Sequence, residues 1–288
     1  MTPARGALAL SLAALAIAAP QVGAATADGR AAERAAAWLA ANSAGAPAGQ
    51  QADAIVALRI AGRSPASLRP RLARLGRDAP AYASTAGGAG KVVMAVVAAG
   101  ADPHRLSGVD YVSRITSRYA SGRYGATAFD QALSMLAIRA AGGATPHAAV
   151  RATLAARGTG GWDFGLSRPA SDSVDATALV IEALRASGVP AGDPGLRAGT
   201  AWMLAQRNGS GGYASAGGAG ATEADSTAGV IRALRSLGRS PAASTRAALR
   251  ALQDGDGGVR FTRAAAGSRL IATTDALIAL SGATLPAT

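Results

Sequence analysis

Nearly uncharged stretches of about ten residues recur along this chain, and each one ends at a glycine. Residues 92–99 precede Gly100, and residues 176–184 precede Gly188. Arginine-containing stretches, apolar on one face only, alternate with them. Because a helix that is apolar on most faces is buried and an amphipathic one lies at the surface, the pattern predicts buried and surface helices in alternation.

The buried stretches belong to a repeat with a Gly-Gly turn, a small-residue loop, an acidic residue and an apolar helix. The three clearest Gly-Gly turns occupy 160–161, 211–212 and 257–258. The positions at which the six copies align, here called the anchors, are Asp53, Lys91, Asp130, Asp175, Asp225 and Asp275. Successive anchors are 38, 39, 45, 50 and 50 residues apart. This spacing accommodates two helices and two loops in each copy.

Six further stretches between the anchors are amphipathic, and four of them begin at or beside proline, which favours the first turn of a helix. These stretches are 31–41, 66–75, 105–119, 146–157, 194–206 and 241–252. We predict an all-α fold, an α/α toroid in which six outer helices surround six inner ones. Repeats of this kind would leave an apolar side exposed at both ends of an open array, so we expect the ring to close.

The anchor acids have a structural explanation. An acid at the start of a helix meets free N–H groups and the positive end of the macrodipole. We therefore expect the acids to cap the inner helices. Lys91 replaces the acid in one copy, and it would either pair with a neighbouring acid across the ring or meet an anionic ligand.

The N-terminus has the pattern of an export signal. Arg5 precedes the apolar run 7–19, and small residues follow at 22–24. We predict a signal peptide over 1–24, cleaved between about Ala24 and Thr26, and a single toroid domain over 27–288 in a secreted or cell-envelope location. The apolar run is shorter than the roughly 20 residues that a membrane span needs, so no stable membrane span is expected.

Composition excludes several classes of function. Cysteine is absent, which removes thiolate nucleophiles and Cys-ligated zinc. The only histidines, His104 and His147, lie beside prolines at expected outer-helix starts, so no metal site or cofactor is expected. The formal charge is +12, but the arginines are spread along the chain rather than clustered with aromatic residues, which disfavours nucleic-acid binding.

The repeat resembles a known family. Trp202 and Gln206, followed by the 211–212 turn and Tyr213, are similar to the QW motif with tyrosine in the place of tryptophan. Over residues 31–282 the chain resembles the prenyltransferase/squalene-cyclase repeat superfamily, whose fold is a terpenoid cyclase-like α/α toroid. The fold alone does not select one activity of that superfamily.

Each activity of the superfamily needs its own residues. Triterpene cyclases carry an Asp-x-Asp-Asp-Thr-Ala motif, of which Asp175 and Asp225 keep the central acid and the Thr-Ala. Glu223 adds a second carboxyl near Asp225, and paired carboxyls can hold a proton. The prenyltransferase zinc set and the thioester both require cysteine. Resemblance to cobalamin carriers implies a tetrapyrrole-like ligand and a partner that supplies a second domain.

We expect a non-catalytic module whose central cavity binds a hydrophobic or tetrapyrrole-like small molecule, or an envelope protein. Aromatic residues on loops offer a large apolar contact area, and tyrosine and tryptophan also carry a hydrogen-bond donor. The expected contacts are Trp162, Asp163, Phe164, Tyr213, Phe261 and Lys91. Alternatively, Trp162 and Tyr213 wedge neighbouring repeats together. The rival function is a terpenoid cyclase-like enzyme with a degenerate acidic motif, in which Glu223 and Asp225 donate the proton and Asp175 lies nearby.

Overall fold

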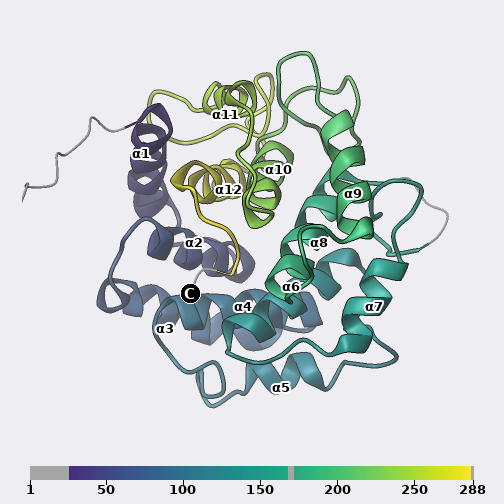
Figure 1. Ribbon diagram of the computed structural model, residues 1–288. Helices are drawn as coiled ribbons and strands as arrows, with labels where there is room; N and C mark the ends of the chain where they lie inside the picture. Colours follow the sequence, from purple (N-terminus) through teal and green to yellow (C-terminus); the bar gives the residue numbers. More distant parts are fainter. Residues whose placement is uncertain (1–25, 168–171, 287–288) are drawn as a thin grey trace, which may run out of the picture.

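The computed structural model describes residues 26–167 and 172–286 (Figure 1), and the expected signal peptide lies outside this part. Its helices form two concentric sets. The outer set is α1 (Ala27–Asn42), α3 (Pro65–Tyr82), α5 (Tyr111–Thr116), α7 (His147–Ala155), α9 (Pro194–Ala205) and α11 (Ala243–Arg250). The inner set is α2 (Ala48–Ile60), α4 (Ala86–Ala98), α6 (Ala128–Ala140), α8 (Val174–Ala186), α10 (Ala224–Ser236) and α12 (Arg269–Ser281).

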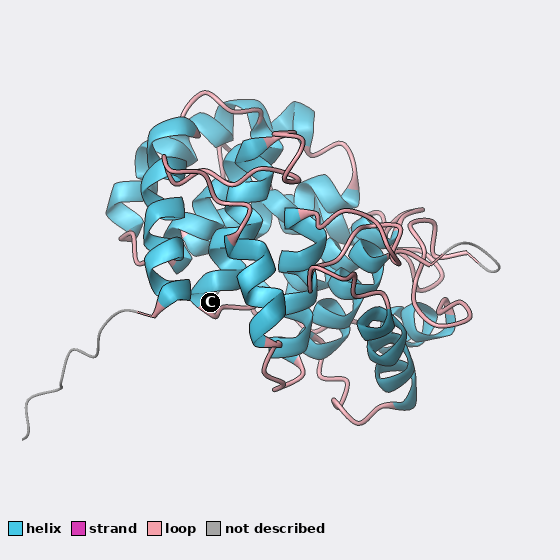
Figure 2. Cartoon of the chain, turned by 90° about the horizontal axis from the view of Figure 1, so that it is seen from above, coloured by secondary structure: helices cyan, strands magenta, loops and turns pink. Residues whose placement is uncertain are grey.

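The inner helices form a closed ring. Each one packs against the next along the chain, and α12 packs against both α2 and α1. Within the described ranges only helices and loops are drawn (Figure 2), with four isolated β-bridges in the loops. The predicted all-α toroid with six helix pairs is confirmed. No helix in the described part is long and apolar enough to cross a membrane.

One outer helix is much shorter than the sequence suggested. Residues 105–119 were expected to be helical throughout, but only α5 forms there. Ser107 and Gly108 adopt positive φ angles of 51° and 78°, which no α-helix contains. Asp110 then caps α5 by accepting a hydrogen bond of 2.8 Å from the Ser113 backbone amide. The acid therefore starts the helix instead of lying inside it.

The anchor acids do not cap the inner helices in which they lie, so that prediction is wrong. Hydroxyl side chains cap three of them, namely Thr85 for α4, Thr127 for α6 and Ser173 for α8. The Asp130 carboxylate instead accepts a 2.9 Å hydrogen bond from the Gly87 amide in the neighbouring inner helix. Hydroxyl oxygens also satisfy free helical N–H groups, which leaves the anchor carboxylates available for other contacts.

Three threonines show how the copies align in space. The Oγ1 atoms of Thr177, Thr227 and Thr273 accept hydrogen bonds from the amides of Trp162, Tyr213 and Val259, at 2.9, 3.1 and 2.8 Å. Each pair fastens an inner helix to the turn before it. Asp175 and Asp225 each lie two residues before the threonine of their copy. In the last copy, the residue two before Thr273 is Ile271. Asp275 lies four residues further on, one helical turn deeper in the ring.

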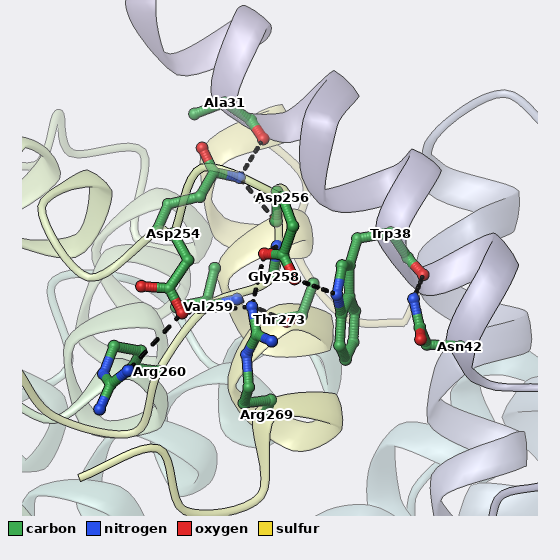
Figure 3. A network of polar contacts seen from close by, with 12 residues as sticks. Ala31, Trp38, Asn42, Asp254, Asp256, Gly258, Val259, Arg260, Arg269 and Thr273 are labelled. Carbon is green, nitrogen blue, oxygen red and sulfur yellow. Dashed lines mark hydrogen bonds and ion pairs between the residues drawn. The ribbon is translucent and has the colours of Figure 1, made fainter.

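The glycine turns allow tryptophan side chains to pack closely on the backbone. A Cβ atom at Gly160 or Gly161 would collide with the Trp202 ring from α9. In the same way, the Trp38 ring from α1 lies against Gly258. These contacts tie each glycine turn to the next outer helix, and the second of them joins the last copy to the first (Figure 3).

Candidate functional site: the central cavity

A cavity of about 210 Å³ lies inside the ring, and every inner helix contributes to its wall. Much of the wall is apolar. Its aliphatic and thioether side chains are those of Val56, Met94, Leu133, Leu179, Ile271, Ile278 and Leu285. Residues three or four apart share one face of a helix, so the inward faces of the inner helices determine the chemistry of the cavity.

The cavity opens at the N-terminal ends of the inner helices. On α12, Ile271 is 38% exposed, whereas Ile278, two turns further along, is 4% exposed. The opposite end is covered by the segment after α12. Leu285 lines the cavity there, and its backbone amide donates a 3.3 Å hydrogen bond to Glu182 Oε1.

Two carboxyls near the open end have no counter-ion. Asp175 and Asp225 lie in the first turns of α8 and α10, and both line the cavity. Within the described ranges neither takes part in an ion pair, and the Oδ1 atom of each is buried without a hydrogen-bond partner. Such an environment favours the neutral, protonated form.

Burial and nearby negative charges raise the pKa values of these two carboxyls. Burial, together with the charges of Asp275 and Asp175, raises the pKa of Asp225 to about 7. Burial also raises the pKa of Asp175, although the Ser226 and Ser215 side chains lower it in part. Because nearby negative charge opposes ionisation of a buried carboxyl, Asp225 holds its proton near neutral pH.

The charged groups one turn deeper are paired. Lys91 Nζ lies 2.6 Å from Asp53 Oδ2. Burial raises the pKa of Asp53, while the Lys91 ammonium opposes that shift. Arg232 Nη1 lies 2.8 Å from Asp275, and its Nε lies 3.2 Å from Glu182. Lys91 therefore pairs with an acid on the neighbouring helix, the first of its two expected roles.

Glu223 occupies a different place from the one the cyclase-like motif suggested. Its Oε2 accepts hydrogen bonds from the Ser215 amide at 2.8 Å and the Ser226 hydroxyl at 3.1 Å. It does not line the cavity. Asp175, from the preceding copy, lines the same cavity as Asp225, and its charge contributes to the raised pKa of Asp225.

The aromatic residues of the Gly-Gly turns face the protein interior rather than the cavity. Trp162 is fully buried, and its Nε1 donates a 2.7 Å hydrogen bond to the Thr153 carbonyl. Tyr213 is also buried. Neither residue lines the cavity. Their positions match the alternative in which they wedge neighbouring repeats together.

The remaining three expected contacts do not line the cavity. The Asp163 side chain is buried in its own loop, where Oδ1 accepts from the Ser167 amide at 2.9 Å. Phe164 is 48% exposed and stacks on Phe129 at 5.6 Å between ring centroids. Because Phe129 lines the cavity, the exposed Phe164 ring continues the aromatic surface from the cavity wall towards the solvent. Phe261 is half-buried and does not line the cavity.

Several groups in the cavity wall were not identified as site residues from the sequence, among them Arg232, Phe129 and Asp275. Arg232 and Phe129 lie on inner helices but not at anchor positions, while Asp275 is an anchor in a different helical register. A signal for Arg232 was present, because arginine is unusual in an otherwise apolar buried helix. In the described part, no His, Asp or Glu side chains gather closely enough to hold a metal ion.

The comparisons with known proteins show the fold. No family model matches the chain, and no curated protein matches it in sequence. The structure of the type II terpene cyclase MstE from Scytonema is similar, with a TM-score of 0.60 at 15% identity over 88% of this chain and 97% of that one. A variant of the same cyclase gives 0.57 at 16% identity, over 88% and 96%. The chain has a terpene cyclase-like toroid fold.

Proposed function

We propose that the chain is a non-catalytic binding module, whose central cavity holds a small amphiphile with a hydrogen-bonding, positively charged head. The observation that carries this proposal is the carboxyl pair of Asp175 and Asp225, which lies without a counter-ion at the open end of a largely aliphatic cavity. An ammonium head would satisfy both carboxyls. The apolar body would then lie along the aliphatic wall.

The charges of the cavity favour a cation. Four carboxyl groups line the wall, from Asp53, Asp175, Asp225 and Asp275, against two basic groups from Lys91 and Arg232. Both basic groups are already paired with acids. The wall is therefore acidic although the chain carries a formal charge of +12. Buried charges are stable mainly when they are paired, so a cationic ligand would complete the site.

The size of the cavity favours a small ligand. Pockets for drug-sized ligands commonly measure roughly 300 to 1,000 Å³, and this cavity measures about 210 Å³. It suits a short amphiphile better than a tetrapyrrole macrocycle or a long polyprene. An envelope protein could reach only its open rim.

Three amphiphiles that differ only in their head groups test the proposal. Octylamine, octanol and octanoate have the same apolar chain, so calorimetric titration at pH 8 isolates the contribution of the head. The amine should bind most tightly and the carboxylate most weakly, because ionised Asp175 and Asp225 attract the ammonium and repel the carboxylate. Equal binding of all three, or preference for octanoate, would exclude the charge-selective site.

A second function is favoured by one observation, the pKa of about 7 for Asp225. A carboxylic acid that keeps its proton near neutral pH can donate it to a substrate, as the terpene cyclase-like fold would suggest. However, among the described residues that line the cavity, Phe129 is the only aromatic one, which leaves little cation–π stabilisation for a carbocation. Incubation with farnesol and squalene, followed by gas chromatography, decides this point. Cyclised product that is lost in Asp225→Asn would establish the enzyme.

We also propose that the protein is exported, on the strength of the N-terminal sequence pattern. N-terminal sequencing of the mature protein from its own host tests this directly. A first residue between about Ala24 and Thr26 is expected. Intact Met1 on the abundant form would contradict export by cleavage.

A further inference from the structure

A second pocket, of about 270 Å³, lies on the outer side of the ring where α1 ends and α2 begins, against α3. Unlike the residues of the central cavity, most of the residues that line it are polar or charged. The polar residues that line it are Ser43, Gln51, Ser67, Arg71 and Arg74. None of them lines the central cavity. The pocket is therefore a separate feature of the fold.

Positive charge in this pocket is held in place by the surrounding structure. The Arg71 guanidinium donates to Ser43 Oγ at 2.6 Å and to the Ala40 carbonyl at 2.5 Å, which fixes it against the end of α1. Burial and the nearby charge of Arg63 lower the pKa of Arg71, as expected where positive charge is not neutralised. Arg74, one turn along α3, has no ion-pair partner within the described ranges.

The start of α2 adds to this positive field. The helix begins after Pro47 without a side-chain cap, and Gln51 in its first turns lines the pocket. Uncapped N–H groups at a helix N-terminus favour an anion nearby. Two arginines thus line the pocket, and Gln51 places the first turns of α2 at its wall.

Gln51 contributes a buried hydrogen-bond acceptor to the pocket, whereas the two arginines contribute donors. It is 5% exposed, and its Oε1 has no hydrogen-bond donor. Its Nε2 donates to the Ala46 carbonyl at 2.5 Å and to Asp78 Oδ2 at 3.3 Å. Because both of those partners are acceptors, the amide cannot be turned round, and Oε1 remains the unsatisfied atom. A buried acceptor of this kind needs a donor that the described part of the chain does not provide.

We infer that this pocket binds a hydroxylated phosphate of the glycerol phosphate class. The phosphate would accept hydrogen bonds from Arg74 and meet the field of Arg71 and α2. A hydroxyl group of the same ligand would donate to Gln51 Oε1. Arginine suits phosphate because its guanidinium offers several donors in one plane, and a simple anion would leave the glutamine oxygen unsatisfied.

Calorimetric titration with glycerol 3-phosphate tests the anion contact. Binding should weaken at least tenfold in Arg74→Gln and stay unchanged in Arg69→Gln. Both arginines are exposed on α3, but only Arg74 lines the pocket, so the second variant controls for general loss of charge. No binding to the wild type, or equal weakening in both variants, would overturn the site.

The hydroxyl contact has its own test. Glycerol 3-phosphate should bind more tightly than methyl phosphate to the wild type, and Gln51→Met should remove that difference, with thermal melts showing that the variant is folded. If Gln51→Met does not fold, the comparison of the two phosphates in the wild type alone decides. Equal affinity for them would remove the role of Gln51.

The same chemistry occurs in free metabolites and in lipid head groups, and vesicles distinguish these sources. Phosphatidylglycerol vesicles present glycerol phosphate at a surface, and phosphatidylcholine vesicles do not. Cosedimentation with the first kind only, lost in Arg74→Gln but kept in Arg69→Gln, assigns the pocket to a head group. Binding of the soluble phosphate without cosedimentation assigns it to a free ligand.

Discussion

Trp38 Nε1 donates a 3.2 Å hydrogen bond to Asp256 Oδ2, which joins the first helix to the last glycine turn across the closing seam of the ring. Arg269 reinforces this contact (Figure 3). Its guanidinium lies 5.0 Å from the centroid of the Trp38 ring and 2.6 Å from Asp256 Oδ1. Residues more than 200 positions apart in the sequence therefore share one polar network.

Closure of the ring predicts that the last helix stabilises the whole fold. Deleting residues 271–288 should cause cooperative loss of helicity, because α12 packs against both α1 and α2. Trp38→Ala should cost about 1 to 3 kcal/mol of unfolding free energy. The exposed Phe164 provides a control, since Phe164→Ala should change stability little. A truncated chain with full helicity and an unchanged Tm would indicate an open array instead.

Stability should fall as the pH rises towards 7. The Asp225 pKa is raised from 3.8 to about 7 in the folded chain. Its neutral form is therefore favoured by folding, and the stabilisation is present below about pH 4 and lost as the pH rises through 7. The difference between these two pKa values corresponds to roughly 2 to 4 kcal/mol of unfolding free energy after allowance for solvent screening.

Urea unfolding at several pH values between 4 and 8 measures the slope of the unfolding free energy against pH. Asp225→Asn should flatten it, because asparagine does not ionise, and should be more stable than the wild type at pH 8. Glu33→Gln replaces an exposed acid outside the cavity and should follow the wild type. A slope that persists unchanged in Asp225→Asn would show that other groups cause it.

The threonine contacts predict a local loss of stability. Thr227→Val keeps the shape of the side chain but leaves the buried Tyr213 amide without its 3.1 Å partner. The cost should be about 1 to 3 kcal/mol. Thr116→Val, at an exposed position, should cost much less. Chemical denaturation measures the unfolding free energy of both variants. Equal losses would show that the threonine contact does not stabilise the attachment of the inner helix to its glycine turn.

The Lys91–Asp53 pair predicts coupling between the two positions. Lys91→Met alone leaves the Asp53 carboxylate without its counter-ion, which should lower stability by about 1 to 3 kcal/mol for this partly exposed pair. Adding Asp53→Asn should restore much of the loss, because the double variant has no unpaired charge. Additive losses in a double-mutant cycle would mean that the two side chains act independently.

The sequence predicted the ring well and the cavity only in part, for a physical reason. Helix period and glycine turns are local signals, so both helix sets could be identified, although α3 is longer and α5 shorter than predicted. Register within a helix depends on which turn faces inward, so Asp275 was aligned with Asp225 although it lies one turn deeper. The contact of Asp175 with the neighbouring copy depends on packing between helices, which no local pattern specifies.

The central claim is that the Asp175–Asp225 pair selects a cationic ligand. Its most direct test is the affinity of octylamine at pH 8 for the wild type, Asp175→Asn, Asp225→Asn and the control Glu33→Gln, with octanol as the uncharged ligand. Each cavity variant should bind octylamine about tenfold or more weakly, because a charge-assisted hydrogen bond is lost, while octanol binding stays nearly constant and Glu33→Gln matches the wild type. Octylamine affinity that is unchanged in both cavity variants would contradict the claim.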